Sequence, residues 1–299
     1  MNFNKFDWIA IDWGTTNFRA WFIKNNKVLK EVTNSDGIKN IEKKDFEKIL
    51  IENLKLSKNL KKKIIIIACG MIGSKQGWLD TGYVKNLNLS KNNLKKVKTK
   101  NTKIKFYIVK GLSQSTPYDV IRGEETQILG YLHKNNKFSG YICLPGTHSK
   151  WIKLKNGKVI KFKTFMTGEL FELITNNSIL KHSIKDKKIN VKCYTNSIFK
   201  TKKSNFNIFD NLFEIRSRTL LSNKKYFPKS ELLGYLIGNE INSNINNLNK
   251  NKVIIIGSYE NSKLYSEAMN TLKIKNTIFN SKDITIAGLK IFYNKFINK

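Results

Sequence analysis

The stretch Ile11-Asp12-Trp13-Gly14-Thr15-Thr16-Asn17-Phe18-Arg19 joins two short apolar strands by a tight turn. Such a turn exposes backbone N–H groups and threonine hydroxyls, which suit phosphate oxygens. Asp12 ends the first strand, where a carboxylate can hold Mg²⁺ through water. The residues that we interpret as a first phosphate loop are Gly14, Thr15, Thr16 and Asn17. In the alternative interpretation this is an ordinary hairpin corner, and Asp12 accepts hydrogen bonds from backbone donors.

The strands around this turn predict an antiparallel meander followed by a parallel crossover. Residues 7 to 12 and Phe18 to Ile23 form the first two strands, and a polar turn leads into a third at Val28 to Val32. The apolar spacing in residues 43 to 59 predicts a helix, which leads to the strand Ile64 to Cys69. A helix between two strands fits a crossover onto a parallel neighbour.

The same order of strands recurs in the second half of the chain. Tyr141 to Leu144, Trp151 to Leu154 and Val159 to Phe162 again have the pattern of three strands. Asn156-Gly157 between the last two is typical of a two-residue hairpin turn. The repetition predicts an internally duplicated protein with two lobes and a cleft between them.

Helical patterns alternate with strands in the remainder of the chain, which places the protein in the α/β class. The further helices are expected at residues 122 to 132, 167 to 180, 207 to 221, 230 to 246, 260 to 272 and 285 to 297. We expect an N-terminal lobe at residues 1–120 and a C-terminal lobe at 121–299, with the final helix able to pack back across the lobes.

A second loop, Pro145-Gly146-Thr147-His148-Ser149-Lys150-Trp151, occupies the same place in the second cycle as the Asp12 turn occupies in the first. Duplication therefore predicts a second phosphate loop, in which Gly146, Thr147 and His148 contact the nucleotide. A polar loop histidine without a chemical role is the alternative for His148. Lys150 is one lysine among many, and its place in the loop makes it a candidate binding residue.

An acidic pair enters a helix between the two loops, in Arg122-Gly123-Glu124-Glu125-Thr126-Gln127. A carboxylate near the cleft can accept a proton from an attacking hydroxyl or orient metal-bound water. Glu124 or Glu125 is therefore the candidate catalytic base. In the alternative interpretation, both acids only favour the positive end of the helix dipole.

A third corner follows the strand Val253 to Ile256, where Gly257-Ser258 precedes a helix. Glycine at a strand end allows a close approach of the backbone, which suits an adenosine or a ribose. Many α/β proteins contain a similar corner, so Gly257 and Ser258 indicate a nucleotide site only together with the two loops.

The formal net charge of +33 on 299 residues first suggests a nucleic-acid partner. Arginine, which is preferred for phosphate and base recognition, occurs only at four positions, whereas lysine and asparagine fill most polar stretches. Runs such as Lys95 to Lys100 lack the interleaved aromatic residues of a single-strand stacking platform. We therefore expect a solvated basic surface and no nucleic-acid partner.

The cysteines and the chain start indicate the compartment. The three cysteines form no CxxC pair, so neither disulfides nor a zinc site is expected, and the compartment is predicted to be reducing. The first residues lack the pattern of a signal peptide, and the longest aliphatic run, Ile64 to Ala68, is too short to span a bilayer. We expect a cytoplasmic protein without a membrane partner. Both a monomer and a homo-oligomer are compatible with the sequence.

The two loops and the Gly257 corner resemble the phosphate 1, phosphate 2 and adenosine motifs of the actin, hexokinase and Hsp70 superfamily, and they occur in the same order. Six segments are similar to signature segments of the 2-dehydro-3-deoxygalactonokinase family. They are Ile11 to Asn17, Gly70 to Ser74, Gly77-Trp78, Arg122 to Gln127, Pro145 to Trp151 and Met166 to Leu170. The resemblance continues to the final helix and implies a two-lobed actin-like ATPase fold, with duplicated ribonuclease H-like lobes and a central cleft.

The resemblance also implies an activity, namely transfer of the γ-phosphoryl group of ATP to the 6-hydroxyl of 2-dehydro-3-deoxy-D-galactonate in galactonate catabolism. Mg²⁺ would bridge the β- and γ-phosphates, with Asp12 holding the metal or its water and Glu124 or Glu125 acting on the hydroxyl. The positions implied to bind the substrate are Arg19, Ser74, Trp78, Arg122, Lys150, Glu169 and Arg216. For the Gly70 to Gly77 segment, a glycine-rich packing turn is the alternative.

The sequence departs from the superfamily pattern at one position, and three alternative functions stand beside this interpretation. The second loop begins Leu144-Pro145, where many relatives place an aspartate, and this argues against a metal role for that loop. A related sugar-acid kinase or an exopolyphosphatase-like hydrolase of the same superfamily is the alternative function. A basic protein that binds nucleic acid and has lost catalysis is a third. The galacto and gluco epimers of the substrate differ by one stereocentre, which the sequence does not separate.

Overall fold

The computed structural model describes residues 6–57, 60, 62–87, 90–244, 248 and 251–297. The chain forms two compact units. The first contains Met1–Phe138, Gly157–Val159 and Ser281–Lys299, and the second contains Ser139–Asn156 and Ile160–Asn280. The chain therefore leaves the first unit after Phe138, later than the expected boundary at residue 120, and its last helix belongs to the first unit.

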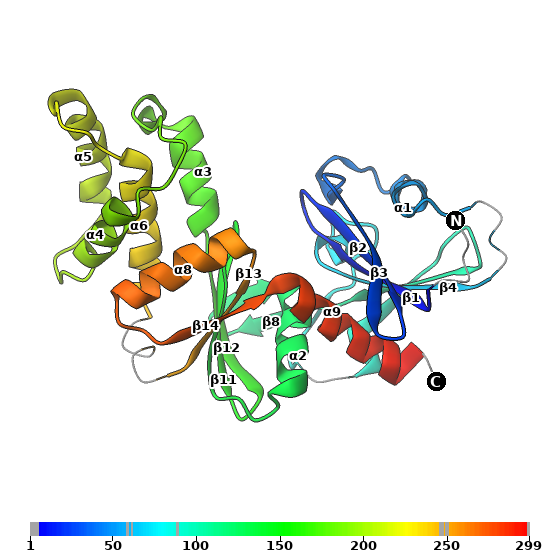
Figure 1. The fold of residues 1–299 in the computed structure, drawn as a ribbon. Helices are drawn as coiled ribbons and strands as arrows, with labels where there is room; N and C mark the ends of the chain where they lie inside the picture. The colour runs from blue at the N-terminus through cyan, green and yellow to red at the C-terminus, as the bar shows by residue number, and fades with distance from the viewer. Residues whose placement is uncertain are drawn as a thin grey trace. The chain divides into compact units, whose positions relative to one another are not determined.

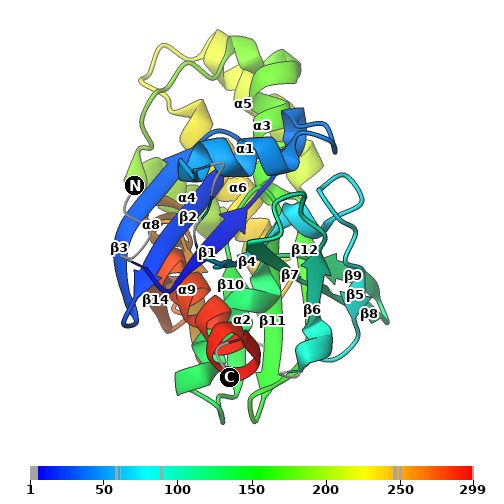
Figure 2. The same ribbon diagram turned by 90° about the vertical axis from the view of Figure 1, so that its right-hand side faces the viewer.

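A six-stranded sheet forms the centre of the first unit, in the order β3-β2-β1-β4-β7-β6 (Figures 1 and 2). Its strands are β1 (Trp8–Trp13), β2 (Phe18–Lys24), β3 (Lys27–Asn34), β4 (Ile64–Cys69), β6 (Leu94–Val97) and β7 (Ile104–Val109). The first three form an antiparallel meander, and β4 and β7 add in parallel. A small second sheet contains β5 (Tyr83–Val84), β8 (Gly111–Ser115) and β9 (Tyr118–Ile121).

Both faces of the large sheet are covered, which explains why β1 is apolar at almost every position. Ile9 and Ile11 point to the face covered by α1 (Phe46–Leu54), where Phe46 packs. Trp8 points to the opposite face, covered by α2 (Glu124–Lys134) and α9 (Ser281–Phe292). Each fully buried apolar side chain of this size contributes about 1.5–3 kcal/mol to folding.

Helices α2 and α9 lie side by side and touch through glycines (Figures 1 and 2). An added Cβ on Gly130 of α2 would lie 2.1 Å from the carbonyl oxygen of Ile284, and one on Gly288 of α9 would lie 2.1 Å from that of Thr126. No side chain fits at either position. This contact attaches the C-terminal helix to the helix that carries the acidic pair.

The second unit repeats the strand order of the first in a five-stranded sheet, β12-β11-β10-β13-β14. Its strands are β10 (Gly140–Leu144), β11 (Ser149–Lys155), β12 (Lys158–Phe165), β13 (Val253–Gly257) and β14 (Asn276–Asn280). An antiparallel meander is again followed by parallel strands. Asn156 and Gly157, with φ of 48° and 71°, form the predicted hairpin turn. The predicted α/β duplication is confirmed.

Within the described residues, five helices accompany this sheet. They are α3 (Thr167–Asn177), α4 (Val191–Lys200), α5 (Ile208–Leu221), α6 (Pro228–Asn242) and α8 (Tyr259–Thr271). Helix α6 is buried along most of its length and packs against α3, α4, α5 and α8. The expected helix at 230 to 246 corresponds to α6, and residues 245–247 lie outside the described residues. Short 3₁₀ turns occur at Ile38–Asn40, Met71–Gly73, Lys91–Asn93 and Ile179–His182, and a π-helical turn at Tyr293–Ile297.

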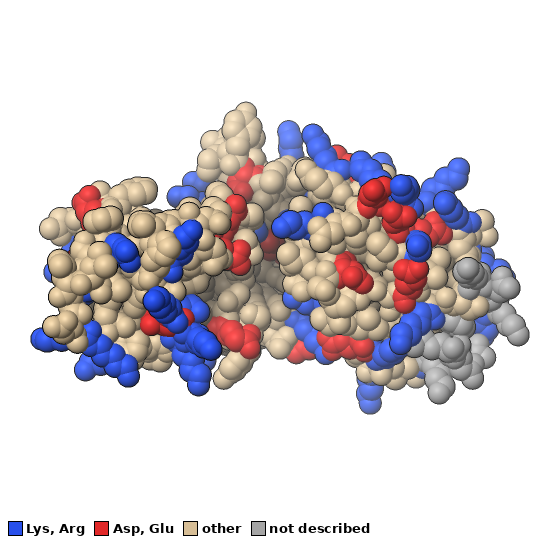
Figure 3. Space-filling model, turned by 90° about the horizontal axis from the view of Figure 1, so that it is seen from above, with Lys and Arg blue, Asp and Glu red and all other residues tan. Residues whose placement is uncertain are grey.

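Two global properties bear on partners. Within the described ranges, every helix is too short or too polar to cross a bilayer. On the face in Figure 3, Lys and Arg side chains are spread over both units and interspersed with acidic and uncharged residues, instead of forming one basic stripe. On this face the basic side chains are therefore dispersed.

Candidate functional site

Asp12 lies at the end of β1, between two neighbouring strands. It pairs in register with Arg19 of β2 and with Cys69 of β4. Arg19 Nη1 donates to Asp12 Oδ2 over 3.0 Å, and the Asp12 side chain is 21% exposed. Burial raises the pKa of Asp12, Arg19 opposes this rise, and the charge of Glu124 adds to it. Asp12 is therefore a partly accessible carboxylate whose charge depends on its neighbours.

Two glycines bring the start of α2 up to this strand end. Gly70 follows β4 with φ of 93°, and an added Cβ there would lie 2.8 Å from the carbonyl oxygen of Trp13 and 3.1 Å from Asp12 Oδ1. Gly123 has φ of 102°, and its Cβ would lie 3.3 Å from the Cα of Gly70. Both positions require positive φ and close approach. The Gly70 segment is thus part of the scaffold that places the acidic pair.

Glu124 and Glu125 both accept hydrogen bonds at the start of α2, but the two side chains lie in different surroundings. Glu124 Oε2 accepts from the N–H of Arg122 over 2.9 Å, and Glu125 Oε2 accepts from the N–H of Gly123 over 2.6 Å. Glu124 is half-buried, whereas Glu125 is 1% exposed. Burial, reinforced by the charge of Glu124, raises the pKa of Glu125 to about 8. Both acids therefore cap the start of α2. Of the two, Glu124 is the one that a substrate can reach.

Backbone hydrogen bonds from the segment 37–39 fix the Gly14–Asn17 turn. The N–H groups of Ile38 and Lys39 donate to the carbonyls of Gly14 and Thr15 over 3.0 Å each. Gly37 packs so closely that an added Cβ would lie 2.3 Å from the Thr15 carbonyl oxygen. The side chains of Thr15, Thr16 and Asn17 stay exposed. This is the arrangement expected of a loop whose shape is set before a phosphate arrives.

Arg122 and Ser74 lie buried together beside the Gly70 segment. The Arg122 guanidinium donates to Thr81 Oγ1 over 2.7 Å and to the Gly82 carbonyl over 3.1 Å, and it stacks on Tyr83 at 4.5 Å from the ring centre. Arg122 Nε and Ser74 Oγ are buried without a hydrogen-bond partner. Buried polar atoms in proteins are normally paired. These two atoms are therefore exceptions to that rule within the described part of the chain.

Trp78, which we expected to contact the sugar, packs its ring between two aromatic core residues. It lies 6.2 Å from Phe46 and 4.9 Å from Phe106, centre to centre. The side chain is only partly buried, so one edge remains accessible.

In the second unit, the loop after β10 is joined to the first turn of α3. The N–H of Glu169 donates to the Thr147 carbonyl over 3.0 Å, and the Glu169 carboxylate contacts His148 Nε2. An added Cβ on Gly168 would lie 2.6 Å from the carbonyl oxygen of Gly146. Glu169 therefore acts within this structure as the partner of His148, and both side chains are partly exposed. Sequence reasoning had placed them in separate roles.

A buried carboxylate beneath this loop, Glu240 of α6, was missed by sequence reasoning as a candidate. It accepts hydrogen bonds from the Trp151 indole over 2.7 Å, from the Tyr265 hydroxyl over 2.8 Å and from the Thr167 hydroxyl. Burial raises the pKa of Glu240, and these donors oppose the rise. Trp151 follows the loop in β11, and Thr167 begins α3, so Glu240 anchors the segments on both sides of the loop.

The Gly257-Ser258 corner adjoins the same loop, because β13 is the parallel neighbour of β10. An added Cβ on Gly257 would lie 3.4 Å from Pro145 Cδ and 2.9 Å from Ser262 Oγ. Ser258 Oγ accepts from the N–H of Asn261 over 3.4 Å and caps α8. The second loop and this corner thus lie together, as expected for one nucleotide site.

Lys150 and Arg216 have partners within the second unit. Lys150 Nζ donates to the His148 carbonyl over 2.7 Å, which keeps it at the loop. Arg216 lies on α5 and donates to Ser183 Oγ over 3.1 Å. Helix α5 belongs to the helical group around α6 and not to the strand ends that carry the loops (Figure 1).

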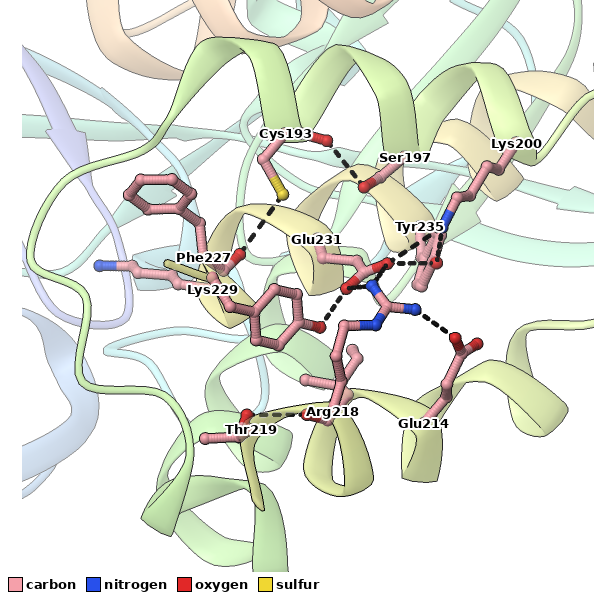
Figure 4. Close-up of polar contacts among 12 residues, drawn as sticks. Cys193, Ser197, Lys200, Glu214, Arg218, Thr219, Phe227, Lys229, Glu231 and Tyr235 are labelled. Atoms are coloured by element: carbon pink, nitrogen blue, oxygen red, sulfur yellow. Dashed lines mark hydrogen bonds and ion pairs between the residues drawn. The ribbon is translucent and has the colours of Figure 1, made fainter. Parts of the chain in front are cut away.

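A separate polar cluster surrounds Glu231 of α6 (Figure 4). Arg218 Nη1 donates to both carboxylate oxygens over 2.9 Å, Tyr235 donates over 2.6 Å, and Tyr226 also donates. Burial opposes ionisation of Glu231, but the tyrosine hydrogen bonds and the Arg218 charge outweigh it and lower the pKa of Glu231. The cluster ties α4, α5 and α6 together beside an open cavity of ≈ 320 Å³. Because its acid is already saturated with donors, we interpret it as structural.

No group of three or more His, Cys, Asp or Glu side chains that could enclose a metal ion occurs in the described part of the chain. The three cysteines are free thiols. Burial, followed by the charge of Asp12, raises the pKa of Cys69 far above its usual range, so this thiol beside the acidic pair stays neutral. Asp12, with Glu124 nearby, is the acidic position at which the strand end could hold a cation.

Comparison with known proteins gives consistent matches over nearly the whole chain. The family described as 2-keto-3-deoxy-galactonokinase matches residues 12–292. A Rhizobium meliloti (strain 1021) protein assigned as 2-dehydro-3-deoxygalactonokinase is 32% identical over 94% of each chain. The 2-dehydro-3-deoxygalactonokinase of Escherichia coli (strain K12) is 29% identical over 79% of this chain and 80% of its own. A crystal structure of a Sinorhizobium meliloti protein with the same assignment superposes with a TM-score of 0.88, at 30% identity and 97% coverage of both chains.

Proposed function

Because the chain belongs to the 2-keto-3-deoxy-galactonokinase family, we propose that it transfers the γ-phosphoryl group of ATP to the 6-hydroxyl of 2-dehydro-3-deoxy-D-galactonate. The observation that carries the proposal is the meeting of Asp12, the threonine turn and the half-buried Glu124 at one strand end of the first unit. Kinase chemistry needs such positioned charges more than covalent catalysis.

Glu124 is the residue that we propose as the catalytic base. Its carboxylate is partly exposed and close enough to Asp12 to influence the pKa of Asp12. Glu125 is fully buried and bonded to the start of α2, so it would have to leave its cap to reach a hydroxyl. In this assignment Glu124 accepts the proton of the 6-hydroxyl as the oxygen attacks the γ-phosphorus, and Glu125 holds the helix start in place.

Mg²⁺ suits this strand end. The ion usually binds one or two carboxylates and keeps waters or phosphates as its other ligands, so a single accessible Asp12 is sufficient and a closed cluster is not needed. When bound, the ion neutralises phosphate charge. Asp12 would hold it directly or through water, and Arg19 opposes the rise that burial causes in the pKa of Asp12.

We assign nucleotide contacts to the two loops and the corner. The exposed Thr15, Thr16 and Thr147 offer hydroxyls to phosphate oxygens, and Gly14 and Gly146 have no side chain to block them. Gly257 and Ser258 adjoin the second loop through Pro145, which supports an adenosine position there. His148 with Glu169 stiffens the second loop.

The substrate carboxylate requires cationic and hydroxyl partners. Ser74 Oγ and Arg122 Nε are buried polar atoms without a hydrogen-bond partner among the described residues, and Arg19 is exposed beside Asp12. We propose these three as substrate-binding groups. Lys150, Trp78 and Arg216 are weaker candidates, because none of them lies beside Asp12 or carries a buried atom without a partner. Lys150 binds a loop carbonyl, Trp78 packs in the aromatic core and Arg216 binds Ser183.

An ATP-consumption assay with Mg²⁺ tests the proposal. Purified protein is supplied with 2-dehydro-3-deoxy-D-galactonate, its gluconate epimer or inorganic polyphosphate, beside the variant Asp12→Asn. We expect turnover that depends on the sugar acid and is lost in Asp12→Asn, with the galactonate compound preferred. Hydrolysis of polyphosphate without sugar-dependent turnover would replace the kinase by an exopolyphosphatase-like hydrolase.

A further inference from the structure

Arg122 is a buried cation whose partners within its own unit are all neutral. The residue is 9% exposed. A hydroxyl, a backbone carbonyl and an aromatic ring surround its guanidinium, and they belong to Thr81, Gly82 and Tyr83. Among the residues that the structure describes, no carboxylate forms an ion pair with Arg122. A buried charge is costly unless an opposite charge compensates it, so Arg122 is a position at which an anion is stabilised.

The hydroxyl of Thr81 fixes one end of this guanidinium. A hydroxyl has one hydrogen to donate, and Thr81 Oγ1 donates it to the Gly73 carbonyl over 3.1 Å. The same oxygen then serves as the acceptor for Arg122 Nη1, which donates over 2.7 Å. The three residues are closely packed, because an added Cβ on Gly73 would lie 2.9 Å from both Arg122 Nη1 and Thr81 Oγ1. Thr81 therefore allows the guanidinium little freedom.

The ring of Tyr83 fixes the plane of the same guanidinium. The guanidinium carbon of Arg122 lies 4.5 Å from the ring centre, where the face of an aromatic ring attracts a cation. The backbone of Gly111 supports the ring, because an added Cβ there would lie 2.7 Å from Tyr83 Cδ1. A planar guanidinium can stack and donate in this way, whereas the ammonium group of a lysine cannot do both.

We infer that Thr81 and Tyr83 are positioning residues that give this kinase its preference for an acid over a neutral sugar. They act through Arg122, which they hold as the partner of the substrate carboxylate. The inference rests on the proposed function, in which Arg122 contacts the sugar acid. A neutral sugar of the same size would leave the charge of Arg122 uncompensated, and a site with an unpaired buried group rejects such an analogue strongly.

The backbone of Arg122 has a separate role from its side chain. Its N–H donates to Glu124 Oε2 over 2.9 Å and so orients the proposed base. The side chain meanwhile binds Thr81 and Tyr83. Loss of the Thr81 hydroxyl would free the guanidinium but leave the backbone hydrogen bond to Glu124 in place. Substitution of Thr81 should therefore change the KM for the sugar acid more than kcat.

Thr81→Val removes the hydroxyl with little change in shape. The Gly73 carbonyl keeps a donor, because the backbone N–H of Thr81 also bonds to it over 3.0 Å, so the loss falls on Arg122 Nη1. We expect the KM for the sugar acid to rise at least about tenfold, with the KM for ATP unchanged. Thr81→Ser keeps the hydroxyl and should restore the KM for the sugar acid.

Tyr83 provides a second pair of variants at a partly exposed position. Tyr83→Leu removes the aromatic face and should raise the KM for the sugar acid about threefold, whereas Tyr83→Phe keeps the face and should match wild type. If Thr81→Val melts below the assay temperature, Tyr83→Leu replaces it in each comparison. Circular dichroism melting of each variant checks the fold.

The carboxamide of the same sugar acid gives a readout that a purely structural role would not move. We expect wild type to prefer the acid in kcat/KM by about 10²-fold or more, and this ratio should fall about tenfold in Thr81→Val. Thr99→Val is the matched control, because the partly buried Thr99 hydroxyl bonds to the Ile104 carbonyl over 2.9 Å, and it should keep the wild-type ratio. An unchanged ratio in Thr81→Val would overturn the inference and leave the kinase assignment intact.

Calorimetric titration of the sugar acid without ATP separates this inference from the proposed function. A wild type that binds the acid more tightly than Thr81→Val does, yet transfers no phosphoryl group, would support the role of Thr81 and remove the kinase assignment. Equal binding of the acid by wild type and Thr81→Val would overturn the inference. A wild type that binds the acid no better than the carboxamide would overturn it as well, whatever its activity.

Discussion

The indole N–H of Trp151 donates to Glu240 Oε1 over 2.7 Å and joins β11 to α6 beneath the second loop. Because Thr167 and Tyr265 donate to the same carboxylate, one buried group holds the residues on both sides of the loop. This carboxylate therefore connects the stability of the second unit with the position of the loop that we propose binds the nucleotide.

Replacing Glu240 by Gln leaves its size nearly unchanged but turns one acceptor oxygen into a donor nitrogen. At least one buried hydroxyl or indole then loses its acceptor, which costs about 1–3 kcal/mol of unfolding free energy. We expect urea unfolding to show this loss, together with a raised KM for ATP and a smaller change in kcat. Glu172→Gln, an exposed acid of α3, is the control. Equal KM values for Glu240→Gln and wild type would show that the anchor does not position the loop.

The acidic pair allows a second prediction, on catalysis. Glu124→Gln should lower kcat by about 10²- to 10⁴-fold, the usual contribution of a general base, while ATP still binds. Glu125→Gln should retain much more activity, because Gln keeps the size of a side chain that is already protonated near neutral pH. Steady-state kinetics of the two variants distinguish the roles. The reverse ranking would make Glu125 the base.

Glu125 also predicts a pH dependence of stability. Its pKa is raised to about 8 in the folded protein, above its unfolded value, so the unfolded chain releases this proton first as the pH rises. The contribution is fully present below the unfolded pKa and is lost as pH rises toward 8, by about 1.4 kcal/mol per pH unit.

Urea unfolding of wild type and Glu125→Gln at pH 5, 6, 7 and about 8 measures this effect. The stability of wild type relative to the variant should fall steadily over the series. Glu42→Gln, at a surface position paired with Lys44, should give a constant offset. Parallel curves for wild type and Glu125→Gln would mean that the carboxyl is ionised in the folded protein.

Much of this architecture follows from patterns that are local in sequence. The three-strand meanders, the turn at Asn156-Gly157 and the strand before Gly257 combine apolar runs with turn residues, so they could be predicted together with the loops. Strand β14 and helix α4 were missed, because β14 is mostly solvent-facing and α4 is rich in polar and β-branched residues.

The candidate site also contains residues that sequence patterns identify and residues that only the structure reveals. Asp12 lies at the end of an apolar strand and Glu124 at a helix start, which marks them in sequence. Glu240 lies among apolar residues of α6, and its donors come from β11, α3 and α8. Only tertiary structure brings these groups together. Helix α9 begins at Ser281, before the predicted start at residue 285. The prediction missed the first turn because that turn is polar and lacks the apolar periodicity.

The contact between α2 and α9 gives a prediction that connects the C-terminal helix to the site. In Gly288→Ala the new Cβ would lie 2.1 Å from the Thr126 carbonyl, which is backbone and cannot rotate away. Helix propensity favours Ala by about 1 kcal/mol, so a loss of stability would have to come from the clash. We expect a net loss of about 1–3 kcal/mol, measured by urea unfolding, and a lower kcat, because α2 carries Glu124 and must move. Lys290→Ala on the same helix is the control for propensity and should leave both quantities near wild type. A Gly288→Ala protein as stable and as active as wild type would show that the two helices separate without disturbing the acidic pair.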